Sequence, residues 1–226
     1  VGGGTVVGGV IARSGSVIRA GGLGLAETLT FANDLGLQAG STFGFDLTDV
    51  PAVGGGTNDL VVVAGRLEPS NTVVVINPLK PLGTGTYTLV THDGTKTTFF
   101  NPVVQGNGSR QGWTLDESTV PTVIALVVTG SFESLVWRPQ ANAAWDLASS
   151  NWFVTSGSTT DRFYQIDTVL FDDSGAYSNL VTLSGALTPQ AVTVNASSNY
   201  TLTGPGSIGG TNGLLKQGAG TLVLNS

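Results

Sequence analysis

Glycine-rich turns interrupt this chain so often that every regular element between them must be short. In the stretch 198–226, alternating apolar and threonine residues at 200–203 end at Gly204-Pro205-Gly206, and Leu222-Val223-Leu224 follows Gly218-Ala219-Gly220. Such alternation indicates a strand with one buried face, and Gly and Pro mark turns. Helices typically need at least about ten residues, more than these runs supply. The chain is therefore predicted to be all-β.

The same rhythm continues through the rest of the 226 residues. Apolar residues within 23–37 fit a period of two better than the 3.6 of a helix, so we expect strands there, with a helix as the alternative. The valine-rich runs 58–67 and 71–79 predict two strands buried on both faces. Residues 120–130, the most apolar run, predict a core strand. Pro78 and Pro81 are expected in a connection, because proline cannot donate to a ladder.

Strand and turn units recur without a strict period, which fits the coils of a β-solenoid and also a β-sandwich. Three tryptophans, Trp137, Trp145 and Trp152, lie close together, and aromatic side chains bury large areas. They predict a small aromatic core, with stacking on a bound glycan as the alternative. A short helical turn over 143–149, capped by Asn142, is also considered.

Composition excludes several classes of protein. Only 11% of residues are charged and the net charge is −6, whereas nucleic-acid binding needs clustered Lys and Arg. No apolar run approaches the roughly 20 residues of a membrane-spanning helix. The chain has no cysteine, which removes disulfides and thiolate sites and suits transport through the periplasm in an unfolded state. It opens with VGGGTVVGGV rather than a signal peptide, so we interpret it as a mature or excised piece.

Candidate chemistry is sparse. Residues 204–209 match the three-glycine dinucleotide pattern, but no helix follows to hold a pyrophosphate, so a turn is predicted. His92, the only histidine, is followed by Asp93-Gly94 and is predicted to be a solvated turn residue rather than a metal ligand or catalytic base. Grouped carboxylates remain as candidates for acid and base catalysis or for calcium, against an ordinary role in turns; they are Asp46, Asp49, Asp59, Asp161, Asp167, Asp172 and Asp173.

The final glycine-rich stretch is similar to a repeat of a known protein family. GLLKQGAGTLVL at 213–224 resembles the autotransporter-associated (passenger-associated) β-strand repeat of bacterial autotransporter passengers. Residues 136–153 and 167–175 resemble the segment that precedes this repeat in large surface proteins of the same type, and 8–22 resembles a stretch found late in such repeats. The resemblance implies a right-handed parallel β-helix, secreted through an outer membrane to the outer surface of a Gram-negative-type bacterium.

These observations lead to one expected organisation: solenoid coils over 1–132, an aromatic-rich inserted segment over 133–175, and coils carrying the repeat motif over 176–226. We expect a structural or adhesive surface protein without enzymatic activity, cofactor or bound nucleic acid. The alternative is a polysaccharide-binding or polysaccharide-active β-helix. Both chain ends read as uncapped strands, so the chain is either cut from a longer passenger or assembles end to end. The residues expected at such a contact are Val6, Val7, Val10, Ile11, Leu222, Val223 and Leu224.

Overall fold

The computed structural model describes residues 2–101, 108–140, 142–175, 178–210 and 213–225. Every regular element in these ranges is a strand, so the predicted all-β class is confirmed. The chain divides into two compact units, one made of residues 1–106 and 111–131 and the other of 107–110 and 132–226. The aromatic-rich segment 133–175 does not stand apart, because its residues share one core with residues beyond 176.

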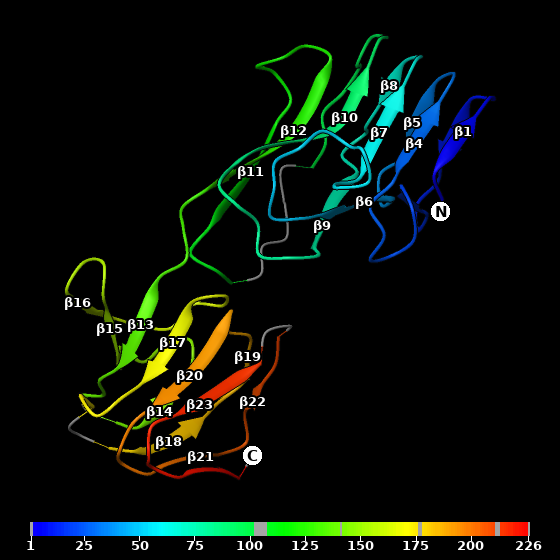
Figure 1. The fold of residues 1–226 in the computed structure, drawn as a ribbon. Coiled ribbons are helices and arrows are strands. Elements are labelled where there is room, and N and C mark those ends of the chain that lie inside the picture. Colours follow the sequence, from blue (N-terminus) through cyan, green and yellow to red (C-terminus); the bar gives the residue numbers. More distant parts are fainter. Residues whose placement is uncertain (1, 102–107, 141, 176–177, 211–212, 226) are drawn as a thin grey trace. The chain divides into compact units, whose positions relative to one another are not determined.

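Unit 1 contains three sheets in which the chain returns to the same sheet after every third strand. β1, β4, β7 and β10 run parallel and side by side (Figure 1), and β2, β5, β8 and β3, β6, β9 form two further parallel sheets. On the side of β10 away from β7, a hairpin of β11 and β12 extends the sheet. β12 pairs antiparallel with β10, and β11 pairs antiparallel with β12. The strands are β1 (Gly4–Val6), β2 (Val10–Ala12), β3 (Val17–Arg19), β4 (Thr28–Phe31), β5 (Leu35–Leu37), β6 (Thr42–Leu47), β7 (Leu60–Val63), β8 (Leu67–Glu68), β9 (Val73–Pro78), β10 (Gly85–His92), β11 (Gly112–Asp116) and β12 (Val123–Thr129).

Unit 2 follows the same scheme with its hairpin at the other end of the strand order. β13, β17, β20 and β23 are parallel, as are β14, β18, β21, β24 and the pair β19, β22. The hairpin β15 and β16 pairs antiparallel with β13. The strands are β13 (Ser134–Trp137), β14 (Ala144–Trp145), β15 (Trp152–Val154), β16 (Thr159–Asp161), β17 (Thr168–Phe171), β18 (Leu180–Leu183), β19 (Ala186–Leu187), β20 (Ala191–Asn195), β21 (Tyr200–Thr203), β22 (Ser207–Ile208), β23 (Leu214–Gln217) and β24 (Leu222–Asn225).

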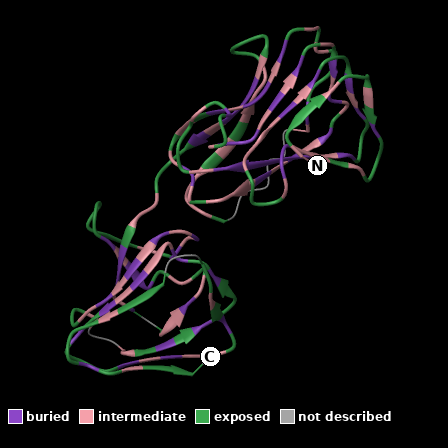
Figure 2. Cartoon of the chain, turned by 45° about the vertical axis from the view of Figure 1, so that its right-hand side comes forward, coloured by how far each residue is buried: buried purple, intermediate pink, exposed green. Residues whose placement is uncertain are grey.

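Parallel register places similar side chains above one another and fills each interior. Val6, Phe31 and Val63 are aligned in successive strands, and Phe171 aligns with Val194. Buried and partly buried residues alternate along β4, β7 and β20 (Figure 2), as a period of two requires. The expectation that the valine-rich runs are buried on both faces is therefore wrong. These strands face the interior on one side only, whereas β6 is buried at every residue from Phe43 to Leu47.

Three further expectations are corrected. Almost all pairing outside the two hairpins is parallel, which is not the pairing of a β-sandwich. The expected helical turn at 143–149 is replaced by β14 and bends, and Asn142 Oδ1 accepts from the Ala144 amide at 3.0 Å. Pro78 is the last residue of β9 rather than part of a connection. β9 lies at the edge of its sheet, where a missing N–H is tolerated.

Candidate functional site

The glycines of the GLLKQGAGTLVL motif are explained by close stacking of one turn on another. Gly218 and Gly220 lie between β23 and β24, and Gly218 adopts a φ of +70°. A Cβ on either glycine would collide with the backbone of the preceding turn at Ala196 or Ser198. The motif therefore encodes a turn that rests directly on its neighbour. Gly204 and Gly206 make the same approach to residues 183–185, so the turn predicted for the three-glycine match is confirmed at 204–206, whereas Ser207 and Ile208 of the same match form β22.

Lys216 completes this motif. It is aligned with the interior residues Val194 and Phe171, and it is the least exposed residue of β23. Its ammonium donates to the carbonyl oxygens of Gln217 and, at 2.9 Å, of Gly218. The charge of Lys216 is thus held by carbonyl oxygens of the turn that follows β23.

The seven residues predicted for an end-to-end contact lie on or beside outermost strands, at one edge of unit 1 and one edge of unit 2. β1 and β2 each pair on one side only, and so does β24 in unit 2. Register with buried partners shows that Val6, Val10, Leu222 and Leu224 face the interior, because they align with Phe31, Leu35, Tyr200 and Leu202. Val7, Ile11 and Val223 are exposed on the outside.

Each of these edges borders an apolar hollow. In unit 1, a hollow of about 340 Å³ is lined by residues including Val6, Val10, Ile18 and Phe31. In unit 2, one of about 350 Å³ is lined by residues including Val192, Ile208 and Leu224. Leu224 is 57% exposed although its aligned neighbour Leu202 is fully buried. The two edges therefore combine unpaired backbone groups with uncovered interior side chains, which together form a surface suited to one more coil.

The three tryptophans proposed for glycan stacking are core residues. Trp137, Trp145 and Trp152 are all 0% exposed. They pack edge to face with ring centroids 5.0 and 5.3 Å apart, and Phe163 and Phe171 join them. No indole face is open to a ligand, so the interpretation as core is supported and glycan stacking by these residues is not.

Two of the candidate acids, Asp46 and Asp59, meet in the interior of unit 1, where both are fully buried. Asp59 accepts from the backbone N–H groups of Glu27 and Asp46, each at 2.8 Å. Asp46 accepts from Arg19 at 2.6 Å, from Asn77 at 2.7 Å and from Gly24 at 2.6 Å. Burial raises the pKa of Asp59 to about 6, against the lowering effect of its two amide donors. These carboxylates hold three successive coils together, and their oxygens are occupied.

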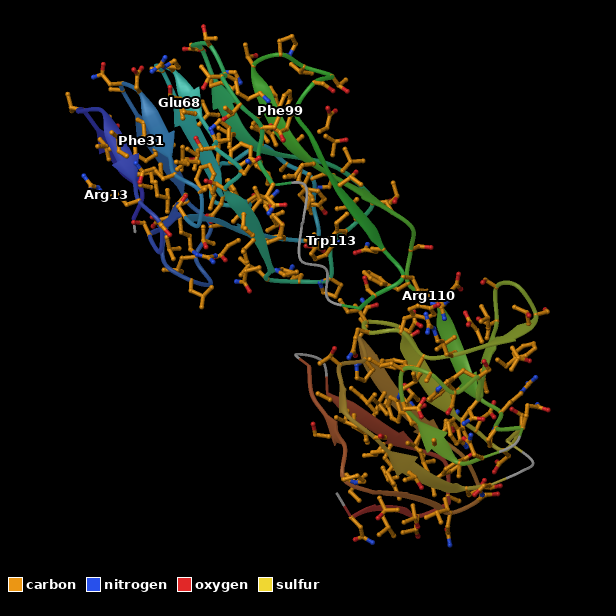
Figure 3. The ribbon with its side chains drawn as sticks, turned by 180° about the vertical axis from the view of Figure 1, so that it is seen from behind. Arg13, Phe31, Glu68, Phe99, Arg110 and Trp113 are labelled. Carbon is orange, nitrogen blue, oxygen red and sulfur yellow. The ribbon has the colours of Figure 1, made fainter. Side chains whose placement is uncertain are left out.

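Asp161 and Asp167 are joined by a residue that the sequence did not single out. Arg110, labelled in Figure 3, donates through Nε to both oxygens of Asp167, at 3.0 and 2.9 Å, and through Nη1 to Asp161 at 2.6 Å. Burial raises the pKa of Asp167, while Arg110 and the amides of Glu133 and Tyr164 oppose that rise. The two acids are an ion-paired clamp rather than a catalytic pair. No local pattern connects Arg110 with a carboxylate 57 residues away.

The remaining acids are turn residues. Asp172 accepts from the Ser174 amide at 2.8 Å, which confirms the predicted turn after β17. Asp173 accepts from the amides of Ser197 and Ser198 in the next coil, and these bonds lower its pKa. Asp49 makes an exposed pairing with Lys80 at 3.5 Å. Within the described residues, no three His, Cys, Asp or Glu side chains are placed to hold a metal, calcium included.

His92 differs from its prediction. It is the last residue of β10 and only 2% exposed, so the expected solvated turn residue is wrong. The Asp93-Gly94 turn begins one residue later, and the strand carries His92 inward in line with Val63. Strict alternation from Tyr87 and Leu89 would have placed His92 outside; a register shift between Thr88 and Val90 turns it inward, and no local signal marks that shift.

Comparison with protein-family models, with curated proteins and with solved structures gives no match to this chain. Among the described residues, no helix has the length and apolar character needed to cross a membrane.

Proposed function

We propose that this chain is a structural or adhesive module of an extracellular surface protein, built as a right-handed parallel β-helix. Support for the solenoid comes from sheets that gain one strand after every third strand and from aligned interior residues. The right hand follows the general preference of parallel crossovers and the resemblance of residues 213–224 to the autotransporter-associated repeat. That resemblance also supports display on the outer surface of a Gram-negative-type bacterium.

The observation that carries the proposal is the pair of open edges. The edge at β1, β2 and β3 and the edge at β22, β23 and β24 each offer unpaired strands beside an apolar hollow, whereas the hairpins β11–β12 and β15–β16 cover other strands. A parallel sheet edge is a template for another strand. We propose that these two edges join end to end between copies, which extends the module without enlarging its core.

Sedimentation velocity over a range of protein concentrations tests this assembly. Lysine at an interior edge position opposes strand addition, because the incoming coil would bury an unpaired charge. Val10→Lys combined with Leu224→Lys is therefore expected to shift the chain to monomer. Leu180→Lys is the matched control, since Leu180 is 50% exposed on β18, a strand paired on both sides, and should leave assembly unchanged.

Two results would overturn end-to-end assembly. One is a wild-type chain that sediments as a monomer at every concentration. The other is a double lysine variant that assembles as well as the wild type. Electron microscopy of the same samples distinguishes ordered filaments from amorphous aggregates, and only filaments support the proposal.

A further inference from the structure

The turn between β1 and β2 contains a glycine that neither its conformation nor its surroundings require. Residues 7–9, 32–34, 64–66 and 93–95 form the same corner in four successive coils, because the strands on both sides of each corner are paired in register. The middle residue is glycine in three of these corners, at Gly8, Gly65 and Gly94. None of the three has a φ in the left-handed region, so backbone conformation does not explain them.

Close stacking explains two of the three glycines. A Cβ on Gly65 would lie 2.6 Å from the carbonyl carbon of Asn33 and 2.6 Å from the amide nitrogen of Asp34. A Cβ on Gly94 would lie 2.5 Å from the carbonyl carbon of Gly65. Both contacts are with the backbone of the preceding corner. A Cβ on Gly8 would meet no atom of the described residues within 4 Å beyond its chain neighbours. By its alignment, Gly8 faces the side of the first coil where a preceding corner would lie.

The interior of the first coil is also incomplete on this side. Gly4 is aligned with Leu29, which is 9% exposed and belongs to the core, so Gly4 holds an interior position without a side chain. Gly4 and Leu29 both line the apolar hollow of about 340 Å³ beside β1. Protein interiors are close-packed, so an added coil needs an apolar side chain at this position.

The last coil of unit 2 offers the matching turn. Residues 218–221 join β23 to β24, and this corner is equivalent to 7–9, because both units pass through their sheets in the same order and each hairpin extends the first sheet of that order. Gly218 and Gly220 contact the preceding turn at 196–198. β23 and β24 each pair on one side only, so the opposite side of the turn lies at an open edge.

A partly exposed leucine lies at the same edge. Leu214 is aligned with Val192, which is 3% exposed, yet Leu214 itself is 39% exposed. When β23 and β1 pair in parallel with their first residues opposite each other, Leu214 lies above Gly4 and fills the position that Gly4 leaves empty. Lys216 then lies above Val6 and brings no unpaired charge, because its ammonium already donates to carbonyl oxygens of the turn.

We propose that, in the end-to-end assembly on which this inference rests, the turn at 218–221 of one copy packs directly against Gly8 of the next. β23 pairs in parallel with β1, with Leu214 opposite Gly4, and β24 pairs in parallel with β2, with Leu222 opposite Val10. The third sheets stay one strand apart. The reason is chain order, because β22 precedes β23 and β24 in unit 2 whereas β3 follows β1 and β2 in unit 1.

Cysteine crosslinking tests this register, because the chain has no cysteine of its own. Val223 and Ile11 are 38% and 68% exposed on the outer face and become opposite residues of adjacent strands. Their Cα atoms are then about 4.8 Å apart, within the range of a disulfide. A mixture of Val223→Cys and Ile11→Cys should therefore give the mixed disulfide as its main product on mild oxidation. Mass spectrometry identifies that product when one variant carries a heavy nitrogen isotope.

Two other mixtures are the matched controls. Asn225→Cys with Ile11→Cys is two residues out of register, which separates the Cα atoms by about 8 Å. Ser207→Cys with Val17→Cys spans the space of one strand between the third sheets, about 9 to 10 Å. Both separations exceed the limit of about 7 Å for a disulfide without backbone movement, so each yield should be at least about tenfold lower.

Gly8→Ala tests the close packing of the turn itself. The added Cβ meets no atom in the separate chain, so urea unfolding should show a variant at least as stable as the wild type. In the joint, the same Cβ would collide with the turn at 218–221, and sedimentation velocity should show association weakened by at least about fivefold. Gly157→Ala is the control, because its Cβ makes only an ordinary contact of 3.6 Å with Thr159 in the turn between β15 and β16. It should leave association unchanged.

Filaments that form without the disulfide between Val223→Cys and Ile11→Cys would overturn this register and leave end-to-end assembly standing. Disulfides mainly between two copies of the same variant would overturn it in favour of a joint with two-fold symmetry. Equal association by Gly8→Ala and the wild type would show that the turn does not pack against Gly8. A wild-type chain that is monomeric at every concentration would overturn the assembly and this joint together.

Discussion

Single carboxylates connect neighbouring coils in both units. Asp59, just before β7, accepts from the amides of Glu27 and Asp46 in the preceding coil, Asp173 accepts from Ser197 and Ser198, and Asp167 accepts from Glu133 and Tyr164. Backbone N–H groups at the corners of stacked coils lack ladder partners, so an aspartate there satisfies donors that water would otherwise have to reach. The candidate acids are thus structural, and their titration should appear in stability rather than in catalysis.

The buried carboxyl of Asp59 makes the free energy of unfolding depend on pH, and this dependence can be measured. Its pKa is raised from 3.8 to about 6 in the folded chain, so the folded state binds the proton more tightly than the unfolded state does. This group therefore lowers the free energy of unfolding as pH rises from about 4 to about 6, by about 3 kcal/mol, and has no further effect above that range. Asp59→Asn cannot ionise, but it loses one of two acceptor oxygens, which costs about 1 to 3 kcal/mol.

We therefore expect Asp59→Asn to be less stable than the wild type at pH 4 and at least as stable as the wild type at pH 7, because the loss of about 3 kcal/mol in the wild type offsets the cost of the lost acceptor. Urea unfolding at intervals between these values measures it. Asp116→Asn is the control, because hydrogen bonds lower the pKa of Asp116 to about 2 and its effect should be nearly constant from pH 5 to 7. A constant difference between Asp59→Asn and the wild type would show that burial does not shift this carboxyl.

At the scale of the element, stacked turns fix where each coil lies on the one before it. Gly94 approaches the backbone at Gly65, Gly65 approaches Asn33 and Asp34, and the turn at 218–220 approaches 196–198. Each contact is between backbones, so no side chain fits between the turns. The same glycines that interrupt the strands therefore also set the spacing of the coils.

Two glycines in the same motif give a matched test of this stacking. Gly220→Ala places a Cβ against the Ser198 carbonyl and should destabilise the last coil by about 1 to 3 kcal/mol through overpacking. Gly213→Ala meets no atom within 4 Å and should change stability by less than about 0.5 kcal/mol. Hydrogen exchange of β23 and β24 measures the difference. Equal protection in the two variants would mean that the turn is not held by close backbone contact.

A feature of this fold could be predicted from the sequence when it depends on neighbouring residues, and could not when it depends on residues far away along the chain. Strands and turns depend on neighbouring residues, so the all-β class and the turns at 172–175 and 204–206 were predictable. Pairing partners depend on residues a coil or more away, so neither the parallel sheets nor the clamp of Arg110 on Asp167 has a local signature. His92 belongs to the second group, since the period of two from Tyr87 and Leu89 points it outward and only the register shift between Thr88 and Val90, set by pairing with β12, turns it inward.

At the scale of the whole molecule, the chain contains two separate cores. One includes Phe43, Phe45 and Tyr87, and the other includes the three clustered tryptophans and Phe171. The boundary between the two units lies at residues 131 and 132. Each unit has its own sheets and its own hairpin, so the cooperative unit of folding is expected to be the unit rather than the chain.

Scanning calorimetry should accordingly resolve two unfolding transitions, and a cavity in one core should shift only one of them. Phe45 is 0% exposed with its ring 4.8 Å from that of Phe43, so Phe45→Ala should cost about 3 to 5 kcal/mol in unit 1. Trp152→Ala should cost a similar amount in unit 2, where its indole contacts Trp137 and Trp145. Because solenoid stability arises mainly between neighbouring coils, neither loss should reach the other core. A single transition that both substitutions lower together would instead require strong coupling between the units and would contradict two independent cores.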